Sequence, residues 1–288
     1  MSATVADNRI SSPVAEFWRR FRRKRVALVA GFIILLIALA AIAAPLVAPY
    51  DPSAPDYDNV LADPSALHPF GTDAYGRDIL SRVIWGGRIS LSVGVISVLV
   101  GGAVGIVLGL VSGFFGGWVD SLIMRFCDVL FAFPGLLLAI GVVAVLGPGI
   151  SNVIWATSVF SVPAFARLVR GDALALKRAV YVQAARSIGV RPVTLMLRHI
   201  LPGALPGVIV NGSLRLGNNI LTAASLSFLG LGAQPPSPEW GAMLADGRSY
   251  LGVADWLTLW PGVAIFVTVL AFNLLGDGLR DALSQKLR

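Results

Sequence analysis

Long apolar runs separated by short polar segments form the dominant pattern along the chain. A helix needs about 20 residues to cross a bilayer core about 30 Å thick, because it rises 1.5 Å per residue. Six runs approach or exceed this length, and they cover residues 26–48, 89–115, 129–146, 150–166, 205–231 and 256–276. The pattern therefore predicts an all-α integral membrane protein with six transmembrane helices.

The first run follows a basic segment and raises the question of a cleaved signal peptide. Residues 26–48 form an uncharged run of 23 residues. The apolar core of a signal peptide is shorter, about 7–15 residues. We therefore expect the first run to remain in the protein as a transmembrane helix.

The basic residues are distributed unevenly between the two sides of the predicted spans. Of the 23 Lys and Arg residues, 18 fall on one side, four fall on the other, and Arg215 lies within the fifth span. The side that is richer in Lys and Arg is normally cytoplasmic. Both termini, with segments 1–25 and 281–288, are then cytoplasmic. The segment 49–88 is then on the outer side of the membrane, and residues 89–280 form a five-helix transmembrane core.

Composition agrees with a membrane protein and limits the chemistry. Hydrophobic residues make up 56% of the chain and charged residues 14%, and the mean hydropathy is +0.77. Soluble domains have about 25% charged residues. The net charge of +7 is explained by topology, so no nucleic-acid partner is expected. Cys127 has no second cysteine to pair with, and His68 lies far from His199, so we predict no metal site.

Small residues recur every fourth position in the second span. They are Ser97, Gly101, Gly105, Gly109 and Gly113, which fall on one face of a helix. Such a face lets another backbone come close in a membrane, where lipid removes the hydrophobic drive for association. We favour packing within the chain, and a subunit interface is the alternative.

The fifth span contains the polar residues Asn211, Arg215, Asn218 and Asn219, at steps of four and three that predict a shared face. An Arg at the centre of a span costs about 2.5–3.5 kcal/mol on insertion scales, so it should face protein or water. We interpret these residues as the lining of a translocation path. The alternative is that Arg215 reaches the cytoplasmic interface with its long side chain.

The sequence contains none of the usual motifs for energy-coupled catalysis. None of the three lysines follows a glycine, so no phosphate-binding loop of the Gly-x-x-x-x-Gly-Lys-Ser/Thr type is present. No His-Glu-x-x-His motif or Cys/His cluster occurs either. The chain is therefore not expected to be an enzyme, and uphill transport would draw energy from a partner or an ion gradient.

The segment 181–202, YVQAARSIGVRPVTLMLRHILP, is basic and amphipathic and lies between two predicted spans. Gly189 can end a helix, and Pro192 suits the first turn of the next one. The predicted unit is a helix, a glycine turn and a second helix. Ala184 and Ala185 are small enough to let another surface approach. The alternative is a loop that packs only on its own bundle.

The same segment resembles the E-A-A-x-x-x-G and I-x-L-P signature of importer-type ABC permeases, with Gln183 in place of Glu and His199 in place of an apolar residue. Resemblance to the dipeptide, oligopeptide, glutathione and nickel permeases extends to other segments, and glutathione and dipeptide permeases are the most similar. These segments are residues 68–83, 116–125, 131–139, 166–171, 226–244 and 270–283.

This resemblance implies a type I importer fold in a bacterial inner membrane. It implies a coupling helix, at about 181–202, that docks on an ATPase subunit. The implied partners are a second homologous permease in a heterodimer, two ATPases, a periplasmic binding protein and membrane lipid. The resemblance also implies that the ATPases bind ATP and Mg and that this chain has no cofactor. The implied coupling residues are Gln183, Ala184, Ala185, Gly189, His199, Leu201 and Pro202.

The periplasmic sequence GTDAYGRD, residues 71–78, has two interpretations. We predict that Asp73, Arg77 and Asp78 contact the binding protein. The alternative is a turn formed at Gly71 and Gly76, with Asp73 or Asp78 bonded to backbone amides.

The expected function is a permease subunit of an ATP-driven importer for short peptides or glutathione. An ion-coupled secondary carrier and a membrane scaffold that does not transport remain as alternatives.

Overall fold

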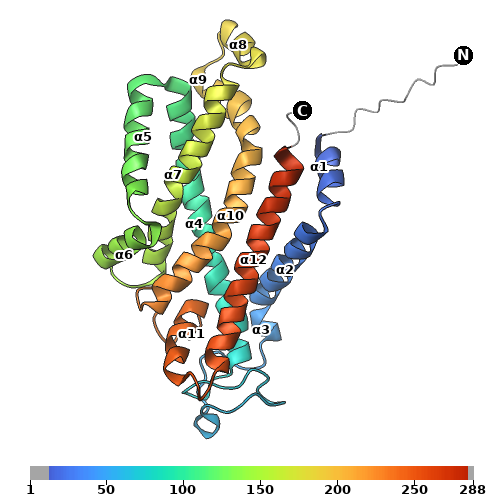
Figure 1. The fold of residues 1–288 in the computed structure, drawn as a ribbon, viewed down its shortest axis with the longest axis vertical. Helices are drawn as coiled ribbons and strands as arrows, with labels where there is room; N and C mark the ends of the chain where they lie inside the picture. The colour runs from blue at the N-terminus through green and yellow to red at the C-terminus, as the bar shows by residue number, and fades with distance from the viewer. Residues whose placement is uncertain (1–12, 285–288) are drawn as a thin grey trace, which may run out of the picture.

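The computed structural model describes residues 13–284 and contains no β-strand within them (Figure 1). The first twelve residues of the predicted N-terminal segment and the last four of the predicted tail lie outside this range. In this part of the chain, five helices are long and apolar enough to cross a membrane, and a bent helix pair makes a sixth candidate. The five are α2 (Arg25–Ile42), α4 (Ile79–Phe115), α7 (Ile150–Leu176), α10 (Leu201–Phe228) and α12 (Trp256–Ser284).

Among the described residues, the helices α4 and α7 make the most extensive contact of any helix pair. A Cβ atom at Gly105 would lie 2.6 Å from the carbonyl oxygen of Val162, and one at Gly109 would lie 2.5 Å from that of Ala166. Only glycine permits this backbone approach, which gives the two helices a contact surface without lipid between them. The small residues of the second span therefore pack within the chain, as the favoured interpretation predicted.

The third predicted span, 129–146, belongs to the bent helix pair and is not one continuous helix. The structure has α5 (Gly117–Ala132) and α6 (Gly135–Leu146), which meet at an angle of 94°. Pro134 has no N–H for a helical hydrogen bond, and it forces Phe133 into an extended conformation with φ −92° and ψ 137°. The break therefore follows from local chemistry at these two residues.

Other helix ends differ from the predicted ones because apolar runs and helices do not end at the same residues. The helix α4 begins ten residues before residue 89, and α7 continues past Arg167 and Arg170 to Leu176. These two arginines form ion pairs with α5, at 2.5 Å between Arg170 and Asp120 and 2.6 Å between Arg167 and Asp128. The first span is shorter than predicted, because α2 ends at Ile42 and a separate turn, α3 (Ala44–Val47), follows.

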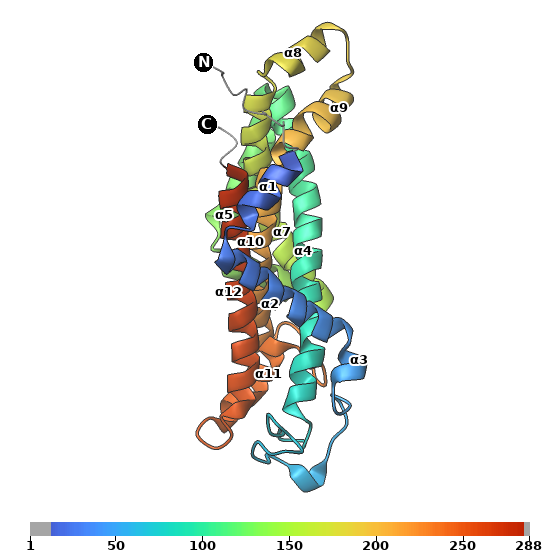
Figure 2. The ribbon, with the colours of Figure 1, turned by 90° about the vertical axis from the view of Figure 1, so that its right-hand side faces the viewer.

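Two regions outside the long helices lie at opposite ends of the bundle (Figures 1 and 2). At one end α8 (Val180–Ser187) and α9 (Pro192–Thr194) project beyond the long helices. The loop that follows α3, with a 3-10 turn at Tyr57–Asn59, occupies the other end.

A short helix, α11 (Trp240–Gly247), also lies at the loop end and was not predicted. It begins directly after the proline-rich stretch, where Glu239 caps it by accepting a 2.9 Å hydrogen bond from the backbone N–H of Ala242. A second 3-10 turn, Arg248–Tyr250, follows it.

Candidate functional site

The projecting unit at α8 is a helix closed by a glycine turn. Gly189 has φ +83°, a conformation that side chains with a Cβ rarely adopt. The turn is closed by hydrogen bonds from the N–H of Gly189 to the carbonyl of Arg186, at 3.0 Å, and from the N–H of Val190 to that of Ala185, at 3.2 Å. After α9 the chain passes through a π-helical segment, Leu195–Ile200, directly into α10. The predicted second helix is therefore continuous with the fifth span.

The inner face of α8 packs on the bundle. Val182 and Ala185 are buried in a cluster with Leu195, Met196 and Ile200 of the π-helical segment. The same cluster includes side chains of α4 and α7. The hydroxyl of Tyr181 donates to the carbonyl of His199, at 3.1 Å, and ties the two halves of the loop together. The orientation of α8 is thus fixed by the ends of three long helices.

The outer face of α8 is available for contact. Ala184 is exposed, whereas Ala185 points inward, so only one of the two predicted contact alanines can meet another surface. Large apolar side chains are exposed around it: Val180 at 85%, Ile188 at 82% and Val193 at 59%. Exposed apolar side chains gathered at the tip of a membrane protein indicate an interaction surface.

The remaining predicted coupling residues have differing environments. Gly189 and Pro202 are exposed, while His199 and Leu201 are half-buried. Gln183 is exposed and donates from Nε2 to the carbonyl of Lys177, at 3.2 Å. Its side chain is therefore bonded within the chain and does not depend on an external charge.

The polar residues of α10 do not share one environment. Asn219 is 1% exposed, and its Nδ2 donates to the hydroxyl of Ser161 on α7, at 3.0 Å. Asn218, its neighbour, is exposed. Arg215 lies over the ring of Phe160, with 5.4 Å between the guanidinium carbon and the ring centre. Asn219 is thus part of the contact between α10 and α7. Asn218 points elsewhere, because neighbouring positions on a helix point about 100° apart.

Asn211 borders a separate hollow of about 330 Å³ between α7, α10 and α12. Within the described residues, its buried Nδ2 has no hydrogen-bond partner. The locations of Arg215 and Asn211 do not decide whether either side chain lines a path. The translocation path therefore stays a prediction.

A larger groove lies between α10 and α12 and was not predicted from the sequence. Its volume is about 630 Å³, and apolar side chains such as Leu221, Phe228 and Phe266 dominate its walls. Asn273 and Ser225 supply polar groups. Periodicity could not single it out, because both helices are apolar on several sides.

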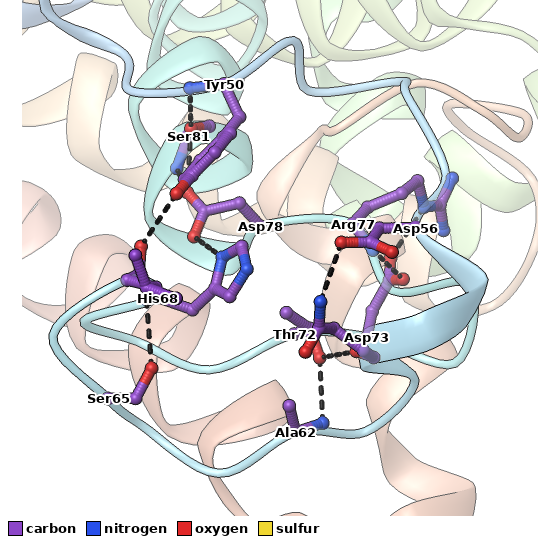
Figure 3. A network of polar contacts seen from close by, with 12 residues as sticks. Tyr50, Asp56, Ala62, Ser65, His68, Thr72, Asp73, Arg77, Asp78 and Ser81 are labelled. Carbon is purple, nitrogen blue, oxygen red and sulfur yellow. Dashed lines mark hydrogen bonds and ion pairs between the residues drawn. The ribbon is translucent and has the colours of Figure 1, made fainter.

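The opposite end of the bundle is organised by buried charges (Figure 3). The carboxylate of Asp73 accepts hydrogen bonds from the backbone N–H groups of Tyr75, at 2.8 Å, and Arg77, at 3.0 Å. It also pairs with Nε of Arg77, at 2.6 Å, and lies 3.6 Å from Nε of Arg82. Burial of such a set is tolerated because each charge has a partner.

Asp78 connects this loop to the start of α4. It caps the helix by accepting a 2.8 Å hydrogen bond from the N–H of Ser81, and its second oxygen lies 3.0 Å from Nδ1 of His68. Nearby, a side-chain hydrogen bond from Asn59 lowers the pKa of the Asp56 carboxyl.

Asp73, Arg77 and Asp78 are 8%, 7% and 2% exposed, so they organise the loop from within. This is the turn with backbone-bonded aspartates that the alternative interpretation described. Contact with a binding protein through these three side chains stays a prediction. Within residues 13–284 no cluster of three potential metal ligands occurs at either end.

The long apolar helices, with the projecting helix α8 at one end, define a polytopic membrane protein. Residues 105–288 match the family described as the binding-protein-dependent transport system inner membrane component. Residues 12–64 match the N-terminal TM domain of oligopeptide transport permease C. The chain belongs to this family of ABC importer permeases, whose members reside in the bacterial inner membrane and are not themselves catalytic.

Among curated proteins, the chain is similar to the glutathione transport system permease protein GsiD of Escherichia coli O6:K15:H31 (strain 536), with 56% identity over 99% of this chain and 94% of the relative. The protein of the same name from Shigella flexneri serotype 5b (strain 8401) is 58% identical over the same shares.

Among solved structures, the inward-facing MetNI methionine ABC transporter matches with a TM-score of 0.55 and 20% identity, over 71% of this chain and 96% of that chain. An amino acid ABC transporter with histidines gives a TM-score of 0.51 and 17% identity, over 69% of this chain and 92% of that chain. These two matches confirm the importer permease fold.

Proposed function

We propose that this chain is one of two permeases in an ATP-driven importer of glutathione or a closely related short peptide. The observation that carries the proposal is the identity of 56% to a glutathione permease along almost the whole chain. Selectivity in such a system is expected to rest largely with a binding protein, because a path has only to tolerate what is delivered to it.

Energy coupling is assigned to α8 in this proposal. Partner ATPase subunits bind ATP and Mg, and this chain holds no cofactor of its own. The exposed Ala184 permits close approach, and Val180 and Ile188 supply apolar contact area around it. Because the inner face of α8 is buried on the bundle, movement of the docked ATPase is passed to the long helices as a rigid-body shift.

A second, homologous permease completes the pathway in this proposal. The groove between α10 and α12 supports it, because a single chain leaves this apolar wall open. The end that carries α8 and the last turn of α12 is cytoplasmic. The opposite end, with the buried Asp73 loop and α11, faces the periplasm and receives the binding protein.

Reconstitution with omitted components tests the proposal. The complete set of two permeases, two ATPases and binding protein is placed in proteoliposomes, and uptake of labelled glutathione is measured with ATP inside. We expect uptake that stops when this chain, the ATPases or the binding protein is left out.

Two outcomes would overturn the proposal. Gradient-driven uptake by this chain alone would identify an ion-coupled carrier. Full uptake by the remaining subunits without this chain would identify a scaffold.

A further inference from the structure

A hollow of about 420 Å³ lies where α1 (Pro13–Phe21) joins α2, beside the last turns of α12. Figure 1 shows α1 and α2 next to this end of α12. The hollow has basic residues on one side, acidic residues on the other and apolar residues between them: Arg23, Lys24, Arg25, Asp277, Asp281, Val26, Ala27, Leu274 and Gly278.

Close helix packing fixes the walls of this hollow. Phe21 and Ala27 are buried against Ala282 of α12. A Cβ atom at Gly278 would lie 2.2 Å from Cβ of Ala27, so glycine is needed there for α2 to approach α12. The charged residues around the hollow are therefore attached to a rigid frame.

The charges around the hollow are only partly paired. Nζ of Lys24 lies 2.5 Å from the carboxylate of Asp281, and this pair closes one edge. Arg23, Arg25 and Asp277 are exposed and have no side-chain hydrogen bond or ion pair within residues 13–284. Two guanidinium groups and one carboxylate thus remain for a ligand with both signs of charge.

The hollow also adjoins the start of an apolar span. Because α2 begins at Arg25, we expect this residue to lie where the hydrocarbon region ends and the lipid headgroups begin. Next to it α1 is amphipathic: Phe21 is buried, Trp18 is 49% exposed, and the guanidinium of Arg22 lies 5.7 Å from the Trp18 ring centre. Tryptophan and basic residues together are typical of the membrane interface.

We propose that this hollow binds the headgroup of a phosphatidylethanolamine molecule from the leaflet on the α8 side. The phosphate pairs with Arg23 and Arg25, since guanidinium groups match phosphate oxygens in geometry and charge. The primary ammonium pairs with Asp277. The acyl chains lie against Val26 and Leu274, which border the hollow.

The carboxylate of Asp277 selects this headgroup over others. An anionic headgroup without an ammonium would place its charge near Asp277 and leave that carboxylate unpaired. A phosphocholine headgroup has the same net charge as phosphoethanolamine, but its methylated nitrogen has no N–H group to donate. Phosphatidylcholine is therefore a matched control lipid.

The test measures lipid retention by the importer assembled around the full-length chain. Native mass spectrometry in detergent is carried out with equal amounts of phosphatidylethanolamine, phosphatidylcholine and phosphatidylglycerol. We expect an about tenfold preference for phosphatidylethanolamine over phosphatidylcholine, which corresponds to about 1.4 kcal/mol for one charge-assisted contact. Asp277→Asn should remove this preference, and Arg23→Gln with Arg25→Gln should weaken retention of all three lipids.

Asp58→Asn serves as the matched control, because Asp58 is an exposed carboxylate in the 3-10 turn Tyr57–Asn59, far from the hollow. It should leave the preference unchanged. Thermal unfolding of each variant checks that a lost preference is not a lost fold.

Three results would overturn the proposal. They are equal retention of phosphatidylethanolamine and phosphatidylcholine by the wild type, a preference for phosphatidylethanolamine over phosphatidylcholine that persists in Asp277→Asn, and lipid retention that none of the variants changes. Because the assay does not involve solute uptake, its result is independent of whether glutathione is the transported solute.

Discussion

Adjacent alanines on α8 provide a matched test of how the projecting helix works. Ala184 is exposed, whereas Ala185 is 8% exposed and belongs to the cluster formed with Val182 and Leu195. Substitution of each by Asp adds the same charge one residue apart. One charge enters solvent on the exposed outer face of α8, and the other enters an apolar contact inside the chain.

The two variants should differ in stability. Exposed substitutions usually change the free energy of unfolding by less than about 0.5 kcal/mol, so Ala184→Asp should unfold like the wild type. An unpaired charge in an apolar cluster costs several kcal/mol, and we expect Ala185→Asp to lower the free energy of unfolding by about 2–4 kcal/mol. Thermal unfolding in detergent measures both changes.

The two variants should differ in coupling as well. Ala184→Asp places a carboxylate among exposed apolar side chains, and burying it against an ATPase would leave it unpaired. We expect ATP-driven uptake to fall at least about tenfold with the fold intact, which corresponds to about 1.4 kcal/mol of lost docking free energy. Wild-type uptake and ATPase association in Ala184→Asp would refute the reasoning, as would an unchanged unfolding temperature in Ala185→Asp.

Three further substitutions test the packing of the bundle. Gly109→Ala would put a Cβ 2.5 Å from a backbone oxygen of α7 and should lower the free energy of unfolding by about 1–3 kcal/mol. Gly141→Ala, which has open space around it, should not lower the free energy of unfolding, and thermal melts compare the two variants. Asn219→Ala removes the bond to Ser161 and should cost about 1 kcal/mol by the same measurement, and an equal loss in the exposed Asn218→Ala would contradict the assignment. Asp73→Ala leaves buried Arg77 and Arg82 without their carboxylate and should destabilise the loop end by about 3–5 kcal/mol, seen as faster proteolysis there than in Asp58→Ala.

Periodicity and local chemistry predicted the parts of this fold that depend on neighbours in sequence. The apolar runs predicted the long helices, and the four-residue spacing of glycines predicted the close contact that Gly105 and Gly109 make with α7. Gly189 was correctly expected to end a helix, and its positive φ explains why. The proline at position 134 indicates a helix break in the sequence, but hydropathy, from which the span was predicted, does not reveal a bend.

The features that depend on distant contacts could not be predicted in this way. Ala184 and Ala185 are equivalent as residues, and only the packing of α8 on the bundle distinguishes them. In the same way, Asn219 turns inward because Ser161 lies opposite it on α7. The hollow at Asp277 joins segments about 250 residues apart, a separation that no local pattern records.

The close contact between α4 and α7 has a mechanical consequence. Their backbones approach closely along a row of glycines. Sliding or rotation of one helix against the other would cause steric clashes, so we expect the two helices to move as one rigid unit. A helix of 27 residues such as α7 is about 40 Å long, and α8 rests on its end. We therefore expect any displacement of α8 to move α4 and α7 together, and the bending needed to open or close a passage to occur elsewhere in the bundle.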